Sequence, residues 1–223
     1  MKKKKKKMKK GFIKFCLIIL ILFGISTLVY YGIGPNIKNI YVLDNNYLSD
    51  QEIIDLAGLN TYPNFYTTSS SSIKKKLKSN TLIKDVKIKK RLFNKIYIYV
   101  DEYEVLFYNQ NTSKYVLENK KEVLLDGIVV PTLINYVPDT KYNTFINKYI
   151  LLDDKVKQKI SEIKYDPNTI DEDRFFLYMN DGNYVYITLT KMELLNKYNE
   201  AITKVEGKKG TLYLDSGNYF EIR

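Results

Sequence analysis

The first 40 residues contain one long uncharged segment. No charged residue occurs from Phe15 to Ile37, and the most apolar part of the segment is Phe15–Val29. Roughly 20 apolar residues in a helix are needed to cross a hydrocarbon layer about 30 Å thick. We therefore predict one transmembrane helix over residues 15–34, with Tyr30 and Tyr31 as aromatic anchors at the membrane surface.

The positive charge of the chain is concentrated before this segment. Nine of the 36 basic residues lie in residues 1–14, which contain no Asp or Glu, so the formal net charge of +11 leaves 27 basic and 25 acidic residues over 15–223. That remainder has no overall charge that would attract nucleic acid. Because lysines before a span keep that end in the cytoplasm, we expect a basic cytoplasmic tail over 1–14 and an extracellular chain after Gly34.

The uncharged segment fits neither a cleaved signal peptide nor a lipoprotein anchor well. A cleaved signal peptide usually has about 7 to 15 apolar residues and ends at a small-residue site of the A-x-A kind. No such site follows Val29. A lipoprotein would carry its cysteine at the end of the apolar run, whereas Cys16 stands at its beginning. An uncleaved membrane anchor is the better interpretation.

The chain after the span alternates between strand and helix patterns. The β-rich segment Ile37–Leu43 ends at an Asp-Asn-Asn turn signal and predicts a strand. Ser49 and Glu52 form a capping box that predicts a helix over Asp50–Ala57, and Gly58 stands where a left-handed stop is expected. A strand and a short helix therefore open this part of the chain.

A second helix and a hairpin follow. Serines at 69–72 can cap a helix on which Ile73 and Leu77 share one face. The lysines at 74–78 could bind anionic lipid or wall polymer, although a solvated helix face explains them more simply. A hairpin around Phe93–Lys95 is predicted by alternating apolar positions, which are Val86, Ile88, Ile96, Ile98 and Val100.

The remaining residues predict mostly strands. The Asn-Asp-Gly triplet at 180–182 is a strong hairpin signal. A helix over Asp153–Ile163 is predicted from Val156, Ile160 and Ile163, which would share one face. The other expected elements are strands at Val105–Tyr108, Lys114–Leu117 and Glu122–Leu125, hairpins of Phe175–Met179 with Tyr184–Leu189 and of Thr211–Leu214 with Tyr219–Ile222, and a helix marked by Met192, Leu195, Tyr198 and Ile202.

Residue types restrict the possible chemistry. The chain has no histidine, and its single cysteine lies in the predicted span, so Ser-His, Cys-His and zinc arrangements outside the membrane are excluded. The acidic groups Asp153–Asp154 and Asp171–Asp173 follow no calcium-loop pattern. Pairs with Ser-x-x-Lys spacing occur at Ser71 and Ser161 without a recognisable catalytic context. We predict no catalytic residues, no metal, no cofactor and no small-molecule substrate.

The chain resembles a known family over nearly its whole length, most strongly over residues 37–105 and 175–220. The shared strings include Leu48-Ser49-x-x-Glu52-Ile53, Ile73-x-x-x-Leu77, and Val86-x-Ile88-x-x-Arg91-Leu92-x-Asn94-x-Ile96-x-Ile98-x-Val100-x-Glu102. With the basic tail and single span, they are similar to the FtsQ/DivIB family of bacterial division proteins, and strings at 177–182 and 217–220 resemble the β domain of its DivIB branch. The chain departs from the family at Phe93 and near Leu82, two turn positions where the family often has proline.

The resemblance implies an α+β fold: one transmembrane helix, a POTRA-like β-α-α-β-β domain over 36–104, and a mixed, mostly antiparallel β domain with flanking helices over 105–223. It also implies a division scaffold in the cell membrane, concentrated at the septum, that assembles septal peptidoglycan synthesis by binding FtsL and DivIC (FtsB in other lineages). Two alternatives from other classes are a signal-anchored enzyme acting on wall polymer and an extracellular polymer-binding module.

A partner site is predicted on the last hairpin. A terminal strand that no later element covers tends to be a sheet edge, and its unpaired backbone groups can accept another chain as an added strand. Family members use this part of the β domain to hold DivIC or FtsB, according to the resemblance. The residues predicted to bind the partner are Leu212, Tyr213, Leu214, Tyr219, Phe220 and Ile222.

Overall fold

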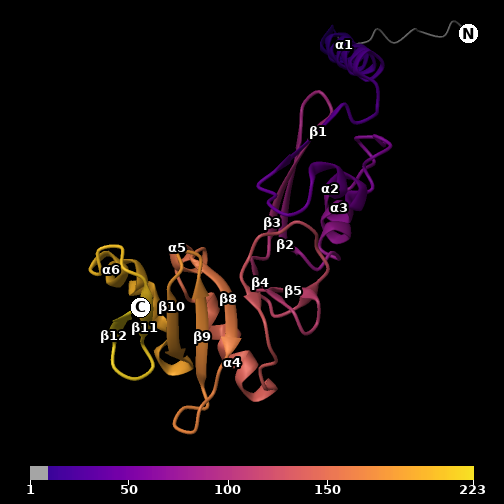
Figure 1. Ribbon diagram of the computed structural model, residues 1–223. Helices are drawn as coiled ribbons and strands as arrows, with labels where there is room; N and C mark the ends of the chain where they lie inside the picture. The colour runs from indigo at the N-terminus through magenta and orange to yellow at the C-terminus, as the bar shows by residue number, and fades with distance from the viewer. Residues whose placement is uncertain (1–9) are drawn as a thin grey trace, which may run out of the picture. The chain divides into compact units, whose positions relative to one another are not determined.

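The computed structural model describes residues 10–223 (Figure 1). The chain forms two compact units, Met1–Asp101 and Glu102–Arg223. Most of the predicted basic tail, over residues 1–9, lies outside the described residues.

The first helix, α1 (Lys10–Ile33), contains the predicted span. Its segment Gly11–Gly32 is long and apolar enough to cross a membrane, with a mean hydropathy of 2.6, and none of it is buried inside the protein. The helix begins before Phe15, so Lys14 lies within its first turns, where a lysine side chain can extend toward the membrane surface. It ends before Gly34, whose φ of 76° is left-handed.

The rest of the first unit has the predicted β-α-α-β-β order. Its elements are β1 (Asn39–Leu43), α2 (Asp50–Ala57), α3 (Ser70–Leu77), β2 (Ile83–Arg91) and β3 (Lys95–Glu102). The sheet order is β1-β3-β2, with β1 parallel to β3. Buried residues from both helices, the sheet and the loop after α2 form its core, among them Ile53, Leu59, Ile73, Leu77, Val86, Ile96 and Ile98.

The signals that predicted α2 are confirmed. The Ser49 side chain accepts a hydrogen bond from the Glu52 N–H, and the Glu52 carboxylate accepts one from the Ser49 N–H at 2.8 Å. Gly58 ends the helix with a left-handed φ of 69°. These local bonds satisfy backbone groups that a helix end leaves unpaired, so the boundaries of α2 follow from a few residues.

Replacing Ser49 by alanine should destabilise α2. The backbone N–H of Glu52 loses its acceptor, and a change of this kind at an N-cap costs about 1 kcal/mol. Amide hydrogen exchange over residues 50–57 should become about fivefold faster, which is the factor that corresponds to a loss of about 1 kcal/mol. Ser71→Ala, an exposed serine inside α3, is the matched control, and equal exchange in both variants would contradict the role of the cap.

The second unit is built around a nine-stranded sheet with the order β12-β11-β10-β9-β8-β7-β4-β5-β6. Five of its neighbouring pairs are antiparallel and three are parallel, which confirms the mixed, mostly antiparallel prediction. Its strands are β4 (Val105–Asn109), β5 (Lys114–Leu117), β6 (Glu122–Val123), β7 (Thr132–Leu133), β8 (Ile160–Tyr165), β9 (Arg174–Met179), β10 (Tyr184–Thr188), β11 (Gly210–Tyr213) and β12 (Tyr219–Ile222).

Helices supply the other half of the core of this unit. They are α4 (Asp139–Ile150), α5 (Asp154–Lys157), the 3₁₀ helix η1 (Leu189–Lys197) and α6 (Tyr198–Thr203). Phe145 of α4 stacks on Phe175 of β9 with ring centroids 4.7 Å apart, and Met192 and Leu195 of η1 are buried in the same core. The predicted helix at Met192–Ile202 thus consists of two short helices of different type.

The predicted helix over Asp153–Ile163 is wrong. Only Asp154–Lys157 is helical there, and β8 begins at Ile160. A register shift between Ile160 and Glu162 points both Ile160 and Ile163 toward the core. The irregularity therefore places two buried residues three positions apart in a strand. This spacing is typical of a helix, which is why the sequence pattern predicted one.

Candidate functional site

Strand β12 is one edge of the nine-stranded sheet. It pairs antiparallel with β11, and no strand in the described residues 10–223 lies on its other side. Figure 1 shows it beside the C-terminus, beyond β11. The predicted hairpin is therefore present, and its last strand has the edge position that the prediction required.

The phase of the ladder determines which backbone groups of β12 are unpaired. In an antiparallel pair, alternate residues bond to the neighbouring strand and those between them point away. The Arg223 N–H donates to the Lys209 carbonyl at 2.9 Å, so Glu221, two residues earlier, also bonds to β11. Phe220 and Ile222 therefore direct their N–H and C=O groups away from the sheet, where another strand could pair with them.

The side chains predicted to bind a partner are divided between the two faces of the sheet. Leu212 and Leu214 are buried in the core, so their side chains stabilise the fold and are not accessible. Phe220 packs against the same core and is partly buried. Ile222 is 53% exposed. Only the last of these four can offer a whole side chain to a partner.

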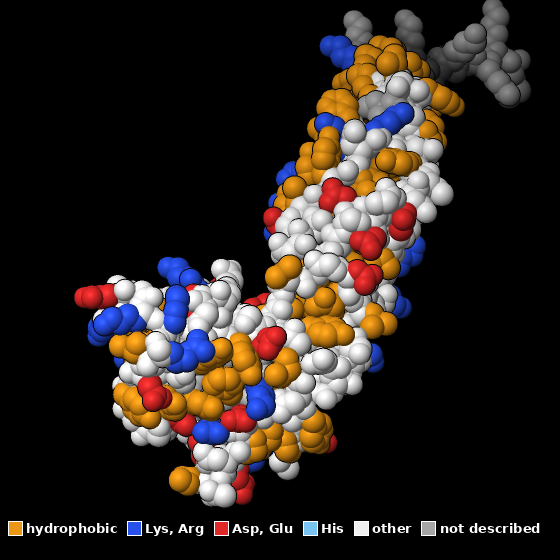
Figure 2. Space-filling view, viewed as in Figure 1, with side chains coloured by type: hydrophobic (Ala, Val, Ile, Leu, Met, Phe, Trp, Pro, Cys, Tyr) orange, Lys and Arg blue, Asp and Glu red, His pale blue; other side chains and the backbone are white. Residues whose placement is uncertain are grey.

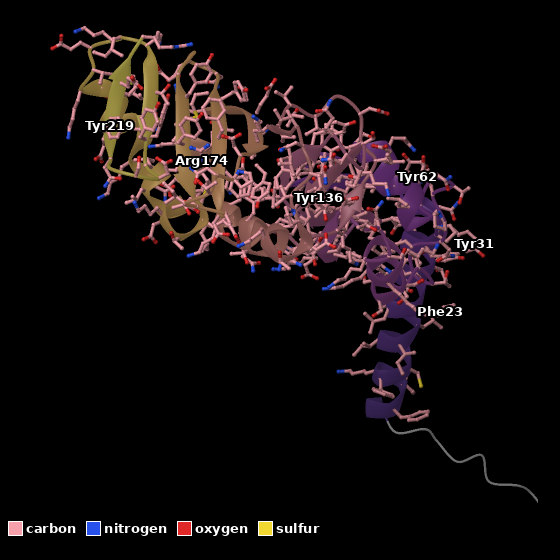
Figure 3. All side chains as sticks on the ribbon, turned by 60° about the horizontal axis from the view of Figure 1, so that its bottom comes forward. Phe23, Tyr31, Tyr62, Tyr136, Arg174 and Tyr219 are labelled. Carbon is pink, nitrogen blue, oxygen red and sulfur yellow. The ribbon has the colours of Figure 1, made fainter. Side chains whose placement is uncertain are left out.

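The opposite face carries a row of stacked aromatic rings. Tyr219 stacks on Tyr213 with centroids 4.7 Å apart, Tyr213 stacks on Tyr186 at 5.3 Å, and Tyr186 lies 4.5 Å from Phe176. The Arg174 guanidinium lies over the Tyr186 ring at 4.4 Å. Figure 3 shows Tyr219 on the outermost strand and Arg174 farther along the sheet. In Figure 2, hydrophobic and charged side chains are intermixed over this part of the second unit.

Sequence reasoning placed Tyr213 and Tyr219 at the site but missed Tyr186 and Phe176. The missed residues alternate with buried residues in β10 and β9. That alternation was the available signal, because period two sends neighbouring side chains to opposite faces.

Polar contacts attach the last hairpin to the sheet. The side-chain oxygen of the buried Asn183 accepts a hydrogen bond from the Gly210 N–H at 3.0 Å, where β11 begins. The Arg223 guanidinium donates to the Gly182 carbonyl at 3.1 Å. The Tyr213 hydroxyl donates to the Glu221 carboxylate, and this bond raises the pKa of Tyr213 to about 12. These contacts hold the edge strand in place in addition to the backbone ladder.

Residues of both Ser-x-x-Lys pairs form hydrogen bonds or ion pairs with other parts of the fold. The Ser161 hydroxyl donates to the Tyr178 carbonyl at 2.9 Å. Lys164 lies 3.0 Å from the Asp166 carboxylate, which raises the pKa of Lys164 and keeps it a poor base. In the other pair, Lys74 contacts Asp85 at 2.9 Å.

The two acidic groups also have internal partners. Asp154 lies 3.5 Å from the Lys157 ammonium, and Asp173 lies 2.6 Å from Lys141. Within residues 10–223, no group of three or more acidic, histidine or cysteine side chains is arranged to hold a metal ion. Asp154 and Asp173 therefore act in ion pairs of the fold.

Comparison with known proteins gives consistent similarities. Residues 36–103 match the family described as POTRA domain, FtsQ-type. The chain is 33% identical to the cell division protein DivIB of Bacillus subtilis over 98% of the chain and 86% of that protein. It is 31% identical to DivIB of Bacillus anthracis, over 96% of the chain and 85% of the relative, and 29% identical to DivIB of Listeria monocytogenes, over 97% and 85%.

One solved structure is also similar. It is the major extracytoplasmic domain of the division protein DivIB from Geobacillus stearothermophilus, in its trans isomer. The match covers 48% of this chain and 96% of the solved chain, with 24% identity and a TM-score of 0.40.

Proposed function

This chain belongs to the DivIB family of bacterial cell division proteins, and from that premise we propose that it is a membrane-anchored scaffold that binds FtsL and DivIC. In this role it assembles the machinery of septal peptidoglycan synthesis. The family membership supports a role in division, and the identity of the two partners is the finer part of the proposal.

The observation that carries the proposal is the open edge of β12. Phe220 and Ile222 present unpaired backbone donors and acceptors, and Ile222 adds an exposed apolar side chain beside them. An extended segment of a partner can pair with such an edge, gaining affinity from the backbone and specificity from the side chains. We propose that DivIC supplies this strand, while the aromatic row on the adjacent face contacts its side chains.

The proposed location follows from the charge and the helix. The apolar helix α1 and the lysines before it support a single span with a cytoplasmic N-terminus and extracellular domains. Concentration at the division septum would result from partner binding. The absence of histidine and the occupied Ser-Lys pairs support a non-catalytic role.

The proposal can be tested by removing β12. The full chain and a chain ending at Ser216 are expressed in membranes together with DivIC, and each is purified through a tag before residue 1. We expect DivIC to co-purify with the full chain and to be lost from the shortened one. Equal recovery of DivIC would place the partner interface elsewhere, and failure of both to retain DivIC would reject the partner itself.

A further inference from the structure

The turn between β2 and β3 carries two exposed apolar side chains at its tip. Leu92 is 81% exposed and Phe93 is 64% exposed. Phe93 and Asn94 both have left-handed φ angles, of 62° and 55°. A left-handed conformation is unfavourable for a bulky side chain, and Asn or Gly usually occupies such turn positions. An aromatic residue at this exposed and strained position contributes nothing to the core.

Hydrogen bonds fix this tip beside the point where the chain leaves α1. The side-chain amide of Asn94, which is buried, donates to the carbonyls of Gly34 and Asn36 at 2.7 and 2.8 Å. The Lys38 N–H donates to the Asn94 carbonyl at 2.9 Å. Figure 1 shows the turn at the end of the small sheet that receives the chain from α1. Leu92 and Phe93 line a surface pocket together with Val29 of α1.

The distance from the turn to the membrane is therefore short. The apolar segment ends at Gly32, and Asn36 is four residues later, so the contact with Asn94 lies within about 13 Å of the hydrocarbon along an extended chain. The headgroup layer on each side of a bilayer is roughly 5–8 Å thick. Side chains that project from this turn can reach that layer.

The charges around the tip suit an anionic surface. Arg91 and Lys38 are exposed, and no Asp or Glu occurs in residues 11–43, 56–84 or 86–100. The neighbouring Lys90 differs, because its ammonium donates to the Phe65 and Thr68 carbonyls and lies over the Phe65 ring. A second exposed aromatic residue, Tyr66, lies on the loop that holds Lys90.

We propose that the β2–β3 turn docks into the outer surface of the membrane that α1 crosses. Leu92 and Phe93 enter the boundary between headgroups and acyl chains, while Arg91 and Lys38 contact anionic lipid headgroups. The docked turn would hold the first unit against the membrane through a second contact besides the helix. This proposal depends on the membrane span and is independent of the division partners.

The absence of tryptophan from the chain allows a direct test. The chain contains no Trp, so Phe93→Trp gives one fluorophore at the tip of the full-length protein. The protein is placed in vesicles of phosphatidylcholine, with or without phosphatidylglycerol, that contain phospholipids brominated on the acyl chain. We expect blue-shifted emission and strong quenching by the brominated lipid. Ile170→Trp, at a position 94% exposed in the second unit, should remain red-shifted and unquenched.

Two further variants separate the apolar and electrostatic contributions. Adding Leu92→Ser to Phe93→Trp should lower the ratio of docked to undocked turn by about tenfold, the loss expected when one apolar side chain no longer leaves water. Adding Arg91→Glu should remove the extra quenching that phosphatidylglycerol produces and leave the level seen in phosphatidylcholine. Quenching in the Phe93→Trp protein no greater than in the Ile170→Trp protein would overturn the proposal. So would blue-shifted emission without quenching, because protein and not lipid would then cover the tip.

Discussion

Replacement of Gly210 by alanine should release β12 from the sheet while the rest of the second unit stays folded. A Cβ atom at this position would lie 1.9 Å from the backbone oxygen of Glu221 and 2.8 Å from the Phe220 ring. A backbone oxygen cannot move aside without moving its strand. Because β12 has only β11 as a neighbour within the described residues, separating the two strands costs less than distorting the core.

Hydrogen exchange and limited proteolysis can measure this release. We expect the amides of Tyr219, Glu221 and Arg223, which bond to β11, to lose most of their protection in Gly210→Ala, and those of β9 and β10 to keep theirs. Gly217→Ala is the matched control, since a Cβ there would meet only the side chain of Tyr219, at 3.2 Å. Binding of DivIC should fall with the protection of β12. A variant that keeps both its protection and its binding would show that the hairpin can accommodate the methyl group.

The first unit could be predicted closely because its signals are local. The capping box of Ser49 and Glu52 and the stop at Gly58 define α2 within a dozen residues. Alternation of Ile96 and Ile98 with polar residues likewise indicates one buried face of β3. These signals do not depend on how distant strands pair, so the local prediction and the tertiary structure agree.

The second unit was less predictable because its sheet is assembled from distant segments. Helix α4 was missed although Phe145, Ile146 and Tyr149 are buried at helical spacing, since no capping side chain marks its beginning at Pro138. The short parallel strand β7 inserts between β4 and β8 through only two residues. Such a strand is too short to show a period in the sequence.

The candidate site was predictable in position and only partly in detail. The sequence analysis predicted that the last hairpin forms a sheet edge, and within residues 10–223 β12 lies at the edge of the nine-stranded sheet. Alternation along β11 places the side chains of Leu212 and Tyr213 on opposite faces of the sheet, and it identifies which of them is buried once the core face is known. The phase of hydrogen bonding on β12 does not follow from the sequence, because shifting the turn by one residue would exchange the roles of Glu221 and Ile222.

The largest expected effect on partner binding follows from which backbone N–H groups of β12 point away from the sheet. Ile222→Pro removes an N–H that points away from the sheet, and its ring would occupy the space where the carbonyl of an added strand must approach. Proline is tolerated on an edge strand when its missing N–H faces solvent, and the exposed Ile222 side chain leaves room for the ring. The lost ladder bond alone is worth about 1 kcal/mol, or about fivefold in affinity. Because the ring also blocks the approach of the added strand, we expect DivIC affinity to fall about tenfold or more. Thermal unfolding of the variant should match that of the unmodified chain.

Glu221→Pro is the matched variant one residue earlier, and it should behave differently. The Glu221 N–H bonds to β11, and its carboxylate accepts from the Tyr213 hydroxyl, so proline there should loosen the hairpin and reduce binding only through that loss of order. Isothermal titration with DivIC and hydrogen exchange over 210–223, measured on both variants, separate the two mechanisms. Reduced binding with an intact hairpin in Ile222→Pro is the result that identifies strand addition at β12. If Ile222→Pro binds DivIC as tightly as the unmodified chain, the partner does not pair with this edge, and the aromatic row becomes the surface to vary next.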